Sequence, residues 1–418
     1  MMRITITALG TRGDVQPMIA LGKTIQKPGV EVRLIAGSNF EGWIKGHGLG
    51  FVPSLDMESL MNSDKGQTWS ESSNNPLQEV QVMRALLHEH AHRMYLPMQE
   101  CAPDTDFWIA GFTSEAYVQA VTEATGKGYL NAMLQPQYPT VSGEASVTPL
   151  VPKRNNPLNR LMGKFVERVL WSILKETTNT FRTSHLGLPP HTFGSYQKAR
   201  RKAHTLFGFS PKVVPNAPDW DRICHICGYW FLDEAQQDSP SAELSAFLEA
   251  GDAPVYIGFG SMSHRDPQHT LNLILEALKH TRQRAVVASG WNSADLQVRS
   301  DQVLLVSSVS HNWLFPRVSA VVHHGGAGTT AAGLRAGKPT LIIPHMSDQP
   351  YWGRRVHELG VGAAPIPRHK LNVARLAAAI TQITTDPAMH QRAEALGRHI
   401  RAEDGLKNAS DLIQQLSS

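Results

Sequence analysis

Short apolar runs rich in β-branched residues alternate with helical stretches along this chain, and the whole pattern occurs twice. The runs lie at residues 4–9, 32–36 and 107–110, and again at 255–259, 285–288, 303–306, 320–322 and 341–343. Alternation of this kind indicates parallel sheets whose strands are joined by crossover helices. With 418 residues, the chain is long enough for two domains of ordinary size. The sequence therefore predicts two α/β domains in series.

A proline-containing connection separates the two series of runs. Proline recurs at positions 211, 215 and 218 among polar residues, and such clusters are typical of loops and linkers. We expect an N-terminal domain over residues 1–215, a linker over 216–235 and a C-terminal domain over 236–418. In open α/β sheets, ligands bind beyond the carboxyl ends of the strands, so functional residues are expected at those ends.

The composition favours an intracellular globular protein. Three cysteines are too few for a disulfide framework, which favours a reducing cytoplasm. Residues 1–6 read as a first strand and not as a signal peptide. No apolar run approaches the roughly 18–20 residues that a membrane span needs. We therefore expect a cytoplasmic protein.

Positive charge is concentrated in one segment. The formal net charge is +4, but residues 151–202 contain eleven Lys and Arg residues and two acidic ones. Aromatic residues are not interleaved with these cations, which argues against nucleic-acid binding. Residues 158–174 combine apolar and basic side chains. Two interpretations stay open for them: an amphipathic helix packed on its own domain, or a peripheral contact with an anionic membrane surface.

A glycine-rich turn follows the run at 320–322. Its sequence, HHGGAGTT at 323–330, precedes a helix expected over 330–336. Glycines let the backbone approach a ligand closely, and a helix N-terminus offers unpaired N–H groups and positive potential. The turn lacks the Gly-Lys-Ser/Thr of a P-loop and the spacing of a dinucleotide fingerprint. We interpret it as a diphosphate site, with a plain strand-to-helix turn as the alternative.

The first strand ends in a second polar turn, GTRGD at 10–14, with a helix expected from about Pro17. Because this turn also follows the carboxyl end of a strand, we expect it to face the same cleft as the diphosphate site. Asp14 within it has two interpretations: a catalytic carboxylate, or a residue that caps the following helix.

Seven segments together resemble a known family, the inverting nucleotide-sugar glycosyltransferases of family 1. They are GTRGDVQP at 10–17, ICGYW at 226–230, GFGSM at 258–262, WLFP at 313–316, HHGGAGTT at 323–330, RAGKP at 335–339 and DQ at 348–349. The resemblance is strongest to the sterol glucosyltransferase branch and to related bacterial natural-product enzymes. It implies an α/β fold of the GT-B type, in which two Rossmann-like domains face a cleft. The N-terminal domain would bind the acceptor and the C-terminal domain the nucleotide sugar.

The resemblance also implies roles for individual residues. Donor-binding residues are expected at Arg12, Ser261, Val309, His324, Gly326, Gly328, Thr329, Thr330, Asp348 and Gln349. Of these, Val309 would meet the base, Asp348 and Gln349 would bind sugar hydroxyls, and the others would hold the diphosphate. Asp14 is expected to be the general base, because it lies where plant members carry a catalytic histidine and the sterol branch carries an aspartate.

The expected reaction transfers a hexose, with UDP-glucose as the expected donor, to an acceptor hydroxyl with inversion. Apolar groups in the N-terminal loops indicate a lipophilic acceptor, and we expect it to contact His88, Trp108, Phe112 and Met133. The helix N-terminus and His324 would provide fixed positive potential for the leaving diphosphate. Neither a metal ion nor another cofactor is therefore expected. A dTDP-deoxysugar is an alternative donor, and sterol, triterpenoid, polyketide and glycolipid remain open as acceptors.

Two other function classes compete with this prediction. The run HEHAH at 88–92 matches the His-Glu-x-x-His helix motif of zinc hydrolases, with His88 and His92 as ligands and Glu115 as a third. The other class is a nucleotide-sugar-binding protein without activity. Bound zinc would indicate the first, and binding of UDP without transfer would indicate the second.

Overall fold

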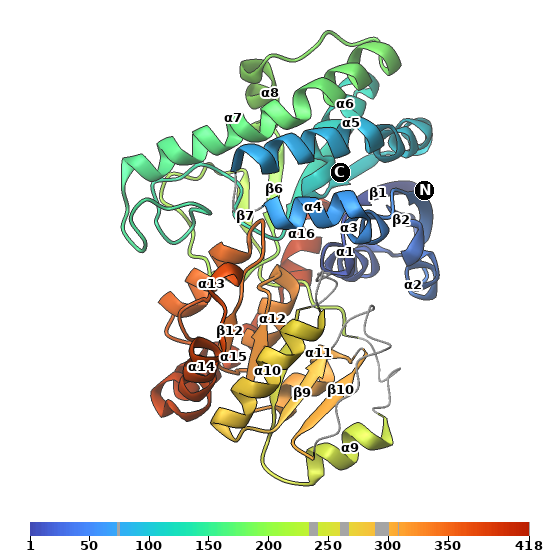
Figure 1. The fold of residues 1–418 in the computed structure, drawn as a ribbon. Helices are drawn as coiled ribbons and strands as arrows, with labels where there is room; N and C mark the ends of the chain where they lie inside the picture. The colour runs from blue at the N-terminus through green and yellow to red at the C-terminus, as the bar shows by residue number, and fades with distance from the viewer. Residues whose placement is uncertain (73–75, 234–240, 260–266, 289–300, 308, 418) are drawn as a thin grey trace. The chain divides into compact units, whose positions relative to one another are not determined.

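The computed structural model describes residues 1–418 with the exception of 73–75, 234–240, 260–266, 289–300, 308 and 418 (Figure 1). The chain divides into two compact units. Unit 1 comprises Met1–Leu232 and Glu403–Ser418, and unit 2 comprises Asp233–Ala402. Each unit contains one sheet with helices around it (Figure 1).

Unit 1 is built on a seven-stranded sheet in which all neighbouring strands are parallel. Its strands are β1 (Met2–Ala8), β2 (Val30–Gly37), β3 (Gly50–Ser54), β4 (Phe107–Ala110), β5 (Gly128–Met133), β6 (His204–Phe207) and β7 (Cys224–Ile226). Its helices are α1 (Arg12–Ile25), α2 (Glu41–Gly46), α3 (Met57–Asn62), α4 (Asp64–Ser72), α5 (Pro76–Cys101), α6 (Glu115–Thr125), α7 (Pro157–Thr180), α8 (Phe193–Arg200) and α16 (Gly405–Ser417). The strand order β3-β2-β1-β4-β5-β6-β7 is that of a doubly wound sheet, whose order reverses between β1 and β4.

Unit 2 repeats this plan on a five-stranded parallel sheet. Its strands are β8 (Val255–Gly258), β9 (Ala285–Ala288), β10 (Val303–Val306), β11 (Ala320–His323) and β12 (Thr340–Ile342). Its helices are α9 (Ala242–Glu249), α10 (Pro267–Thr281), α11 (His311–Leu314), α12 (Ala327–Arg335), α13 (Gln349–Glu358), α14 (Val373–Thr385) and α15 (Pro387–Ala402). The order β10-β9-β8-β11-β12 reverses between β8 and β11. The predicted fold class, two α/β domains with parallel sheets, is confirmed.

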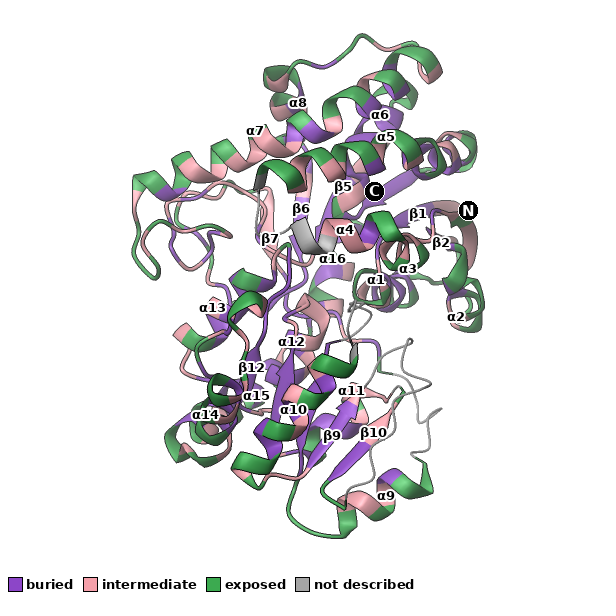
Figure 2. Cartoon of the chain, viewed as in Figure 1, coloured by how far each residue is buried: buried purple, intermediate pink, exposed green. Residues whose placement is uncertain are grey.

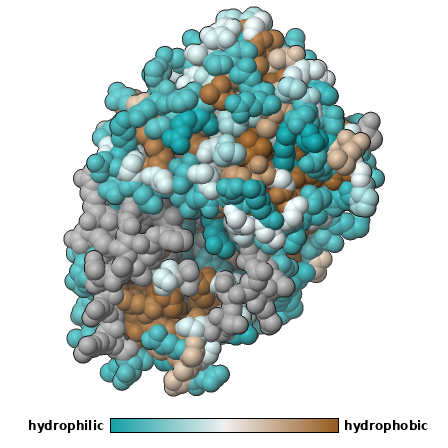
Figure 3. Space-filling model, turned by 90° about the vertical axis from the view of Figure 1, so that its right-hand side faces the viewer, coloured by the Kyte–Doolittle hydropathy of each residue, from teal (hydrophilic) through white to brown (hydrophobic). Residues whose placement is uncertain are grey.

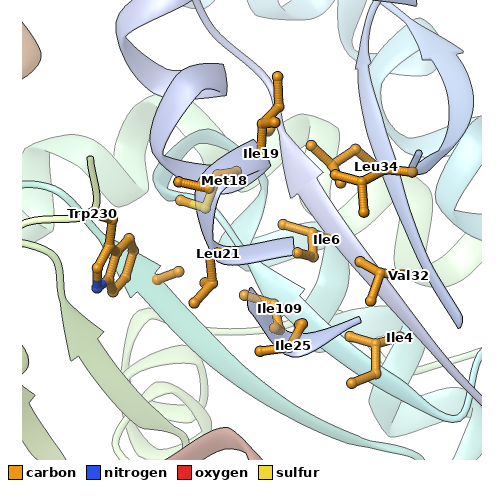
Figure 4. Packing of buried hydrophobic residues seen from close by; sticks show 14 of the residues in the cluster. Ile4, Ile6, Met18, Ile19, Leu21, Ile25, Val32, Leu34, Ile109 and Trp230 are labelled. Carbon is orange, nitrogen blue, oxygen red and sulfur yellow. The ribbon is translucent and has the colours of Figure 1, made fainter. Parts of the chain in front are cut away.

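The strands of the unit 1 sheet are largely buried (Figure 2), and apolar core clusters lie on both of its faces. On one face, Ile4 and Ile6 of β1 pack with Val32 of β2 and Ile19 of α1 (Figure 4). Successive residues of a strand point to opposite faces, so Trp108 of β4 lies in a second cluster with residues of α5 and α6. Parallel strands are usually buried on both faces, which explains why they read as continuous apolar runs.

The C-terminal helix α16 belongs to unit 1, although the predicted boundaries assign residues 236–418 to one C-terminal domain. Ala409 and Ile413 of α16 are buried in the same core cluster as α1 and β1. The Asn408 side chain also donates a hydrogen bond to the Cys227 carbonyl, at 2.9 Å. The apolar face of α16 therefore completes the N-terminal core, and the chain crosses between the two units twice.

Figure 3 shows one face of the molecule, which is mostly hydrophilic with small apolar groups in its upper part and has one larger apolar area, next to grey atoms, in its lower part. Scattered apolar residues are normal on protein surfaces, so only a larger cluster requires an explanation. Within the described part of the chain, no helix is both long and apolar enough to cross a membrane.

Candidate active site

The glycine-rich turn after β11 is shaped by close backbone packing. Gly325 has a φ of +98°, which L-residues with a side chain rarely adopt, and an added Cβ would lie 2.6 Å from Cγ2 of Ile342. The Gly325 N–H donates to Nδ1 of the fully buried His323 at 2.9 Å. An added Cβ on Gly326 would lie 2.7 Å from Nε2 of His324. Close packing therefore favours glycine at positions 325 and 326 of this turn.

Gly325→Ala is expected to destabilise unit 2 by about 1–3 kcal/mol through backbone strain alone, and further through the contact with Ile342. Gly126→Ala is a matched control, because Gly126 has a φ of +69° and nothing lies within 4 Å of the added Cβ. Unfolding in urea would measure both free energies. Equal losses in the two variants would contradict the role given to the Ile342 contact.

Helix α12 begins at Ala327, three residues before the predicted start, with Gly326 as its N-cap. No side chain caps this end. The first N–H groups of a helix have no acceptor within the helix, and they carry the positive end of its dipole. The main-chain N–H groups of residues 327–329 thus offer a candidate anion site at the carboxyl end of β11. This end lies beside β8, where the strand order of the sheet reverses.

His324 contributes a neutral imidazole to this anion site. Burial lowers the pKa of His324 to about 4, so the ring carries no charge at pH 7. Its Nδ1 is buried and has no hydrogen-bond partner. Without a bound ligand, the positive potential that we expect at this site is therefore not a charge on the His324 ring. The ring can offer one N–H donor, and the positive potential comes from the helix N-terminus.

Thr330 and Gln349, two predicted donor ligands, make hydrogen bonds that shape the site. The Thr330 hydroxyl donates to the Gly326 carbonyl at 2.9 Å, within the first turn of α12. The side-chain oxygen of Gln349 accepts from the main-chain N–H groups of His345 and Met346, at 2.7 and 3.1 Å. These contacts hold the turn and the loop after β12 in a defined conformation.

The other predicted donor residues are placed as follows. Asp348 precedes α13, and its carboxylate accepts from the Trp352 indole N–H at 2.7 Å. The Gln349 main chain lies against Gly325, where an added Cβ would be 3.2 Å from the Gln349 carbonyl oxygen. The structure therefore brings the predicted sugar ligands next to the predicted diphosphate turn. Gly328 and Thr329 lie in the first turn of α12. Val309 is partly buried and packs against the core cluster that contains Leu314 and Phe315. Ser261 lies outside the described residues.

Asp14 lies in the first turn of α1, because this helix begins at Arg12 and not at Pro17. Thr11 and Asp14 form a capping box, in which an Asp14 carboxylate oxygen accepts from the Thr11 N–H at 2.9 Å and from its hydroxyl at 3.3 Å. The carboxylate packs against Gly10, where an added Cβ would lie 2.2 Å from Oδ2. Capping was one of the two interpretations that the sequence left open for Asp14, and the structure places Asp14 as the third helical residue of a Thr-x-x-Asp capping box, not as the cap of a helix at Pro17.

The pKa of Asp14 is raised, because neighbouring protein atoms displace part of the water around its carboxylate. The hydrogen bonds from Thr11 act in the opposite direction. More than a third of the residue stays accessible to solvent, which limits the rise. A carboxylate with a raised pKa is a better proton acceptor than an ordinary aspartate. The structure thus gives Asp14 a capping role and a raised pKa.

Glu58 and Trp43 surround Arg12, and sequence patterns did not identify either of them. The Arg12 guanidinium lies 4.6 Å from the centre of the Trp43 ring. Its main-chain N–H donates to Glu58 at 3.1 Å, and Asn39 donates to the other carboxylate oxygen of Glu58 at 2.9 Å. Glu58 therefore fixes the start of α1 next to Asp14. It is 46 residues away from Arg12 in sequence, and no local motif encodes that contact.

The predicted acceptor residues fall into two groups. Trp108 and Met133 are fully buried in unit 1 and present no surface to an acceptor. In a strand buried on both faces, apolar residues serve the core, which corrects their assignment as acceptor residues. Phe112 is 40% exposed just after β4, the strand beside β1. His88 is exposed on α5 and lies 3.5 Å from Glu176.

The zinc alternative is not supported by the surroundings of its proposed ligands. Glu115 is buried in an ion pair with Arg200, at 2.8 Å, and Glu89 pairs with Lys65 at 2.5 Å. Among the described residues, no group of three or more His, Cys, Asp or Glu side chains is arranged to hold a metal ion.

Two Asp-x-Asp triplets, at 104–106 and 219–221, are further candidates for divalent-metal binding. Asp104 pairs with Arg3 and Arg33, at 2.6 and 2.5 Å. Asp219 accepts from the Thr140 hydroxyl at 2.5 Å. These carboxylates serve structural contacts in unit 1.

Two family descriptions match the chain in series. Residues 4–123 match "Glycosyltransferase family 28 N-terminal domain", and residues 273–408 match "Erythromycin biosynthesis protein CIII-like, C-terminal domain". The first segment contains Asp14, and the second contains the glycine-rich turn and α12. Asp14 and the glycine-rich turn therefore each lie in a segment with known relatives.

Named relatives are similar over nearly the whole chain. Sterol 3-beta-glucosyltransferase UGT80A2 of Arabidopsis thaliana is 36% identical, over 98% of this chain and 64% of the relative. Sterol 3-beta-glucosyltransferase UGT80B1 of the same plant is 35% identical, over 99% of this chain and 68% of the relative. A sterol 3-beta-glucosyltransferase of Cryptococcus neoformans is 31% identical, over 99% of this chain and 27% of the relative. The chain thus spans about two thirds of the plant proteins and about a quarter of the fungal one.

Solved structures share the fold at lower identity. The glycosyltransferase of kitacinnamycin superposes with a TM-score of 0.72 at 18% identity, over 100% of this chain and 99% of that one. Glycosyltransferase VinC, solved with dTDP, superposes with a TM-score of 0.68 at 18% identity, over 100% and 99% of the two chains. The expected GT-B fold, with two parallel-sheet α/β domains, is therefore confirmed.

Proposed function

The chain belongs to the family of the sterol 3-beta-glucosyltransferases, and on this premise we propose that it transfers glucose from UDP-glucose to the hydroxyl of a sterol-like acceptor. The transfer inverts the anomeric centre. The observation that carries this proposal is a pair of half-sites at the reversal points of the two sheets. Unit 2 has an uncapped helix N-terminus beside a neutral histidine, and unit 1 has a carboxylate with a raised pKa.

In the proposed donor site, the diphosphate binds the N–H groups at the start of α12, with Gly326, Gly328 and Thr329 allowing close approach. His324 donates a hydrogen bond to the same group. Asp348 and Gln349 bind sugar hydroxyls, and Val309 meets the base through its main chain. By the family resemblance, Arg12 and Ser261 are also expected to contact the diphosphate.

In the proposed reaction, Asp14 accepts the proton of the acceptor hydroxyl. The hydroxyl oxygen forms a bond to the anomeric carbon on the face opposite the diphosphate. The bond from that carbon to the phosphate oxygen breaks, and its electron pair leaves with the nucleoside diphosphate. Positive potential at the α12 N-terminus and the His324 N–H stabilise this developing charge. In this mechanism, the anion site stabilises the negative charge of the leaving diphosphate, which a metal ion does in other enzymes.

This proposal is tested by incubating the purified chain with UDP-glucose and a panel of sterol, triterpenoid and flavonoid acceptors, with and without EDTA. Mass spectrometry then detects hexose addition. We expect a glucosylated sterol in equal yield under both conditions. Loss of the product in EDTA, with recovery on addition of a divalent metal, would contradict the metal-independent mechanism. UDP binding without any product would indicate a binding protein.

We also propose a peripheral contact with a membrane, because sterols reside in lipid bilayers and unit 1 carries a surface suited to such contact. This surface is the outward side of α7, whose residues are largely exposed or half-buried (Figure 2).

A further inference from the structure

The first half of α7 presents large apolar side chains to solvent. Leu158, Leu161 and Phe165 are 52%, 63% and 61% exposed. Their spacing of three and four residues places them on one face of the helix. Leu150, in the loop before α7, is 47% exposed. A cluster of this size differs from the scattered apolar residues of an ordinary surface.

These side chains are not needed to hold α7 in place. The helix packs on unit 1 through another face, where Trp171 is buried and stacks on Tyr196 of α8 with ring centres 4.5 Å apart. Asn159 is fully buried between the exposed leucines and accepts from the Leu150 N–H at 2.7 Å. The inner face thus fixes both the helix and the preceding loop, and it leaves the apolar residues facing outward.

Cations accompany this apolar stripe. An open groove of about 660 Å³ runs along it, and its lining includes Lys164, Arg168 and Arg201. The nearby acid Glu167 is turned inward, where it accepts from Arg200 at 2.8 Å and from Gln197 at 2.7 Å. The outward face therefore combines apolar bulk with positive charge.

We propose that this face of α7 docks on an anionic lipid bilayer, with the apolar side chains inserted among the lipids and the cations at the headgroups. An interfacial helix has this combination of an apolar face and flanking Lys and Arg residues, and anionic lipids attract such cations. A two-fold contact with a second copy of this chain would oppose cations with the same cations. Charge complementarity therefore favours an anionic surface as the occupant.

Docking on a bilayer would give the enzyme access to an acceptor in the membrane, and only this purpose rests on the proposed function. Its test uses no substrate, so its failure is distinguishable from failure of the transferase proposal. The purified chain is mixed at low salt with vesicles of phosphatidylcholine alone or with added phosphatidylglycerol, and bound protein is measured by sedimentation. We expect binding only with the anionic lipid, and we expect salt to weaken it.

Three variants separate the contributions. Leu161→Gln with Phe165→Gln is expected to weaken binding at least tenfold, because two large apolar side chains no longer enter the bilayer. Lys164→Gln with Arg168→Gln is expected to weaken it roughly twenty-five-fold, since each cation near an anionic surface contributes about a factor of five. Leu77→Gln is the matched control, because Leu77 is 78% exposed on α5, and this variant should bind like the unchanged chain.

Two results would overturn the inference. One is equal sedimentation of the unchanged chain and the Leu161/Phe165 variant. The other is a concentration-dependent dimer in light scattering that the same double variant abolishes, because the occupant would then be a second copy of the chain.

Discussion

Asp14→Asn is expected to lower turnover at least 100-fold, by the usual contribution of a general base, while the affinity for UDP stays unchanged. Asparagine cannot accept the acceptor proton, but its side-chain oxygen can still accept from the Thr11 N–H. The capping box and the start of α1 should therefore persist. Steady-state kinetics and calorimetric titration with UDP would measure the two effects. Near-normal turnover of Asp14→Asn would contradict the assignment of Asp14 as general base and would leave it only the capping role.

The pH profile provides a control for this assignment. Asp14 must be ionised to accept a proton, so kcat/KM falls as the pH drops through its raised pKa. The Thr11 hydroxyl stabilises the ionised form. Thr11→Val should therefore raise the pKa further and move the acid limb to higher pH, without abolishing activity at high pH. An acid limb that does not move would contradict the hydrogen-bond contribution of Thr11.

His324→Ala is expected to weaken UDP binding about tenfold or more, because a hydrogen bond to a charged group is lost from a buried site. Turnover should fall about 100-fold, which is typical when a donor to a developing negative charge is removed. His324→Gln retains an N–H donor and should recover part of both losses. Unchanged UDP affinity in His324→Ala would contradict the placement of the diphosphate at α12.

Protonation distinguishes His324 from an ordinary hydrogen-bond donor. An anion favours the charged imidazole, so diphosphate binding should raise its pKa from about 4. UDP binding should then take up protons, and more of them as the pH falls from 7 toward 5. Calorimetry in buffers of different ionisation enthalpy would measure this uptake. The His324→Gln variant serves as the control, because it measures the protons taken up by the phosphate groups of UDP alone. Equal proton uptake by this variant and by the unchanged chain would contradict protonation of His324 on diphosphate binding.

The apolar runs of the sequence predicted much of the fold for a physical reason. Parallel strands covered by helices are buried on both faces, so eight runs were recognisable, and each overlaps a strand of the structure. The strands β3, β5, β6 and β7 were missed. Polar residues or proline interrupt their patterns, such as Pro53 in β3, Asn131 in β5 and His225 in β7.

The candidate site was predictable where a motif is local. The glycine-rich turn and Asp14 were located from sequence, because strand ends and helix starts have short-range signals. Three features depend on contacts far apart in sequence: the Glu58 contact to Arg12, the return of α16 to unit 1, and the burial of Trp108. The neutral state of His324 was also missed, because burial by the whole fold determines its pKa.

The most direct measurement is the NMR spectrum of the product formed from UDP-glucose, labelled with ¹³C at the anomeric carbon, and a sterol. We predict a β-glucoside on the sterol hydroxyl, because an inverting displacement converts the α-linked donor into a β-linked product. An α-glucoside would contradict a single displacement assisted by Asp14. Free glucose with no sterol product would contradict transfer to a lipophilic acceptor.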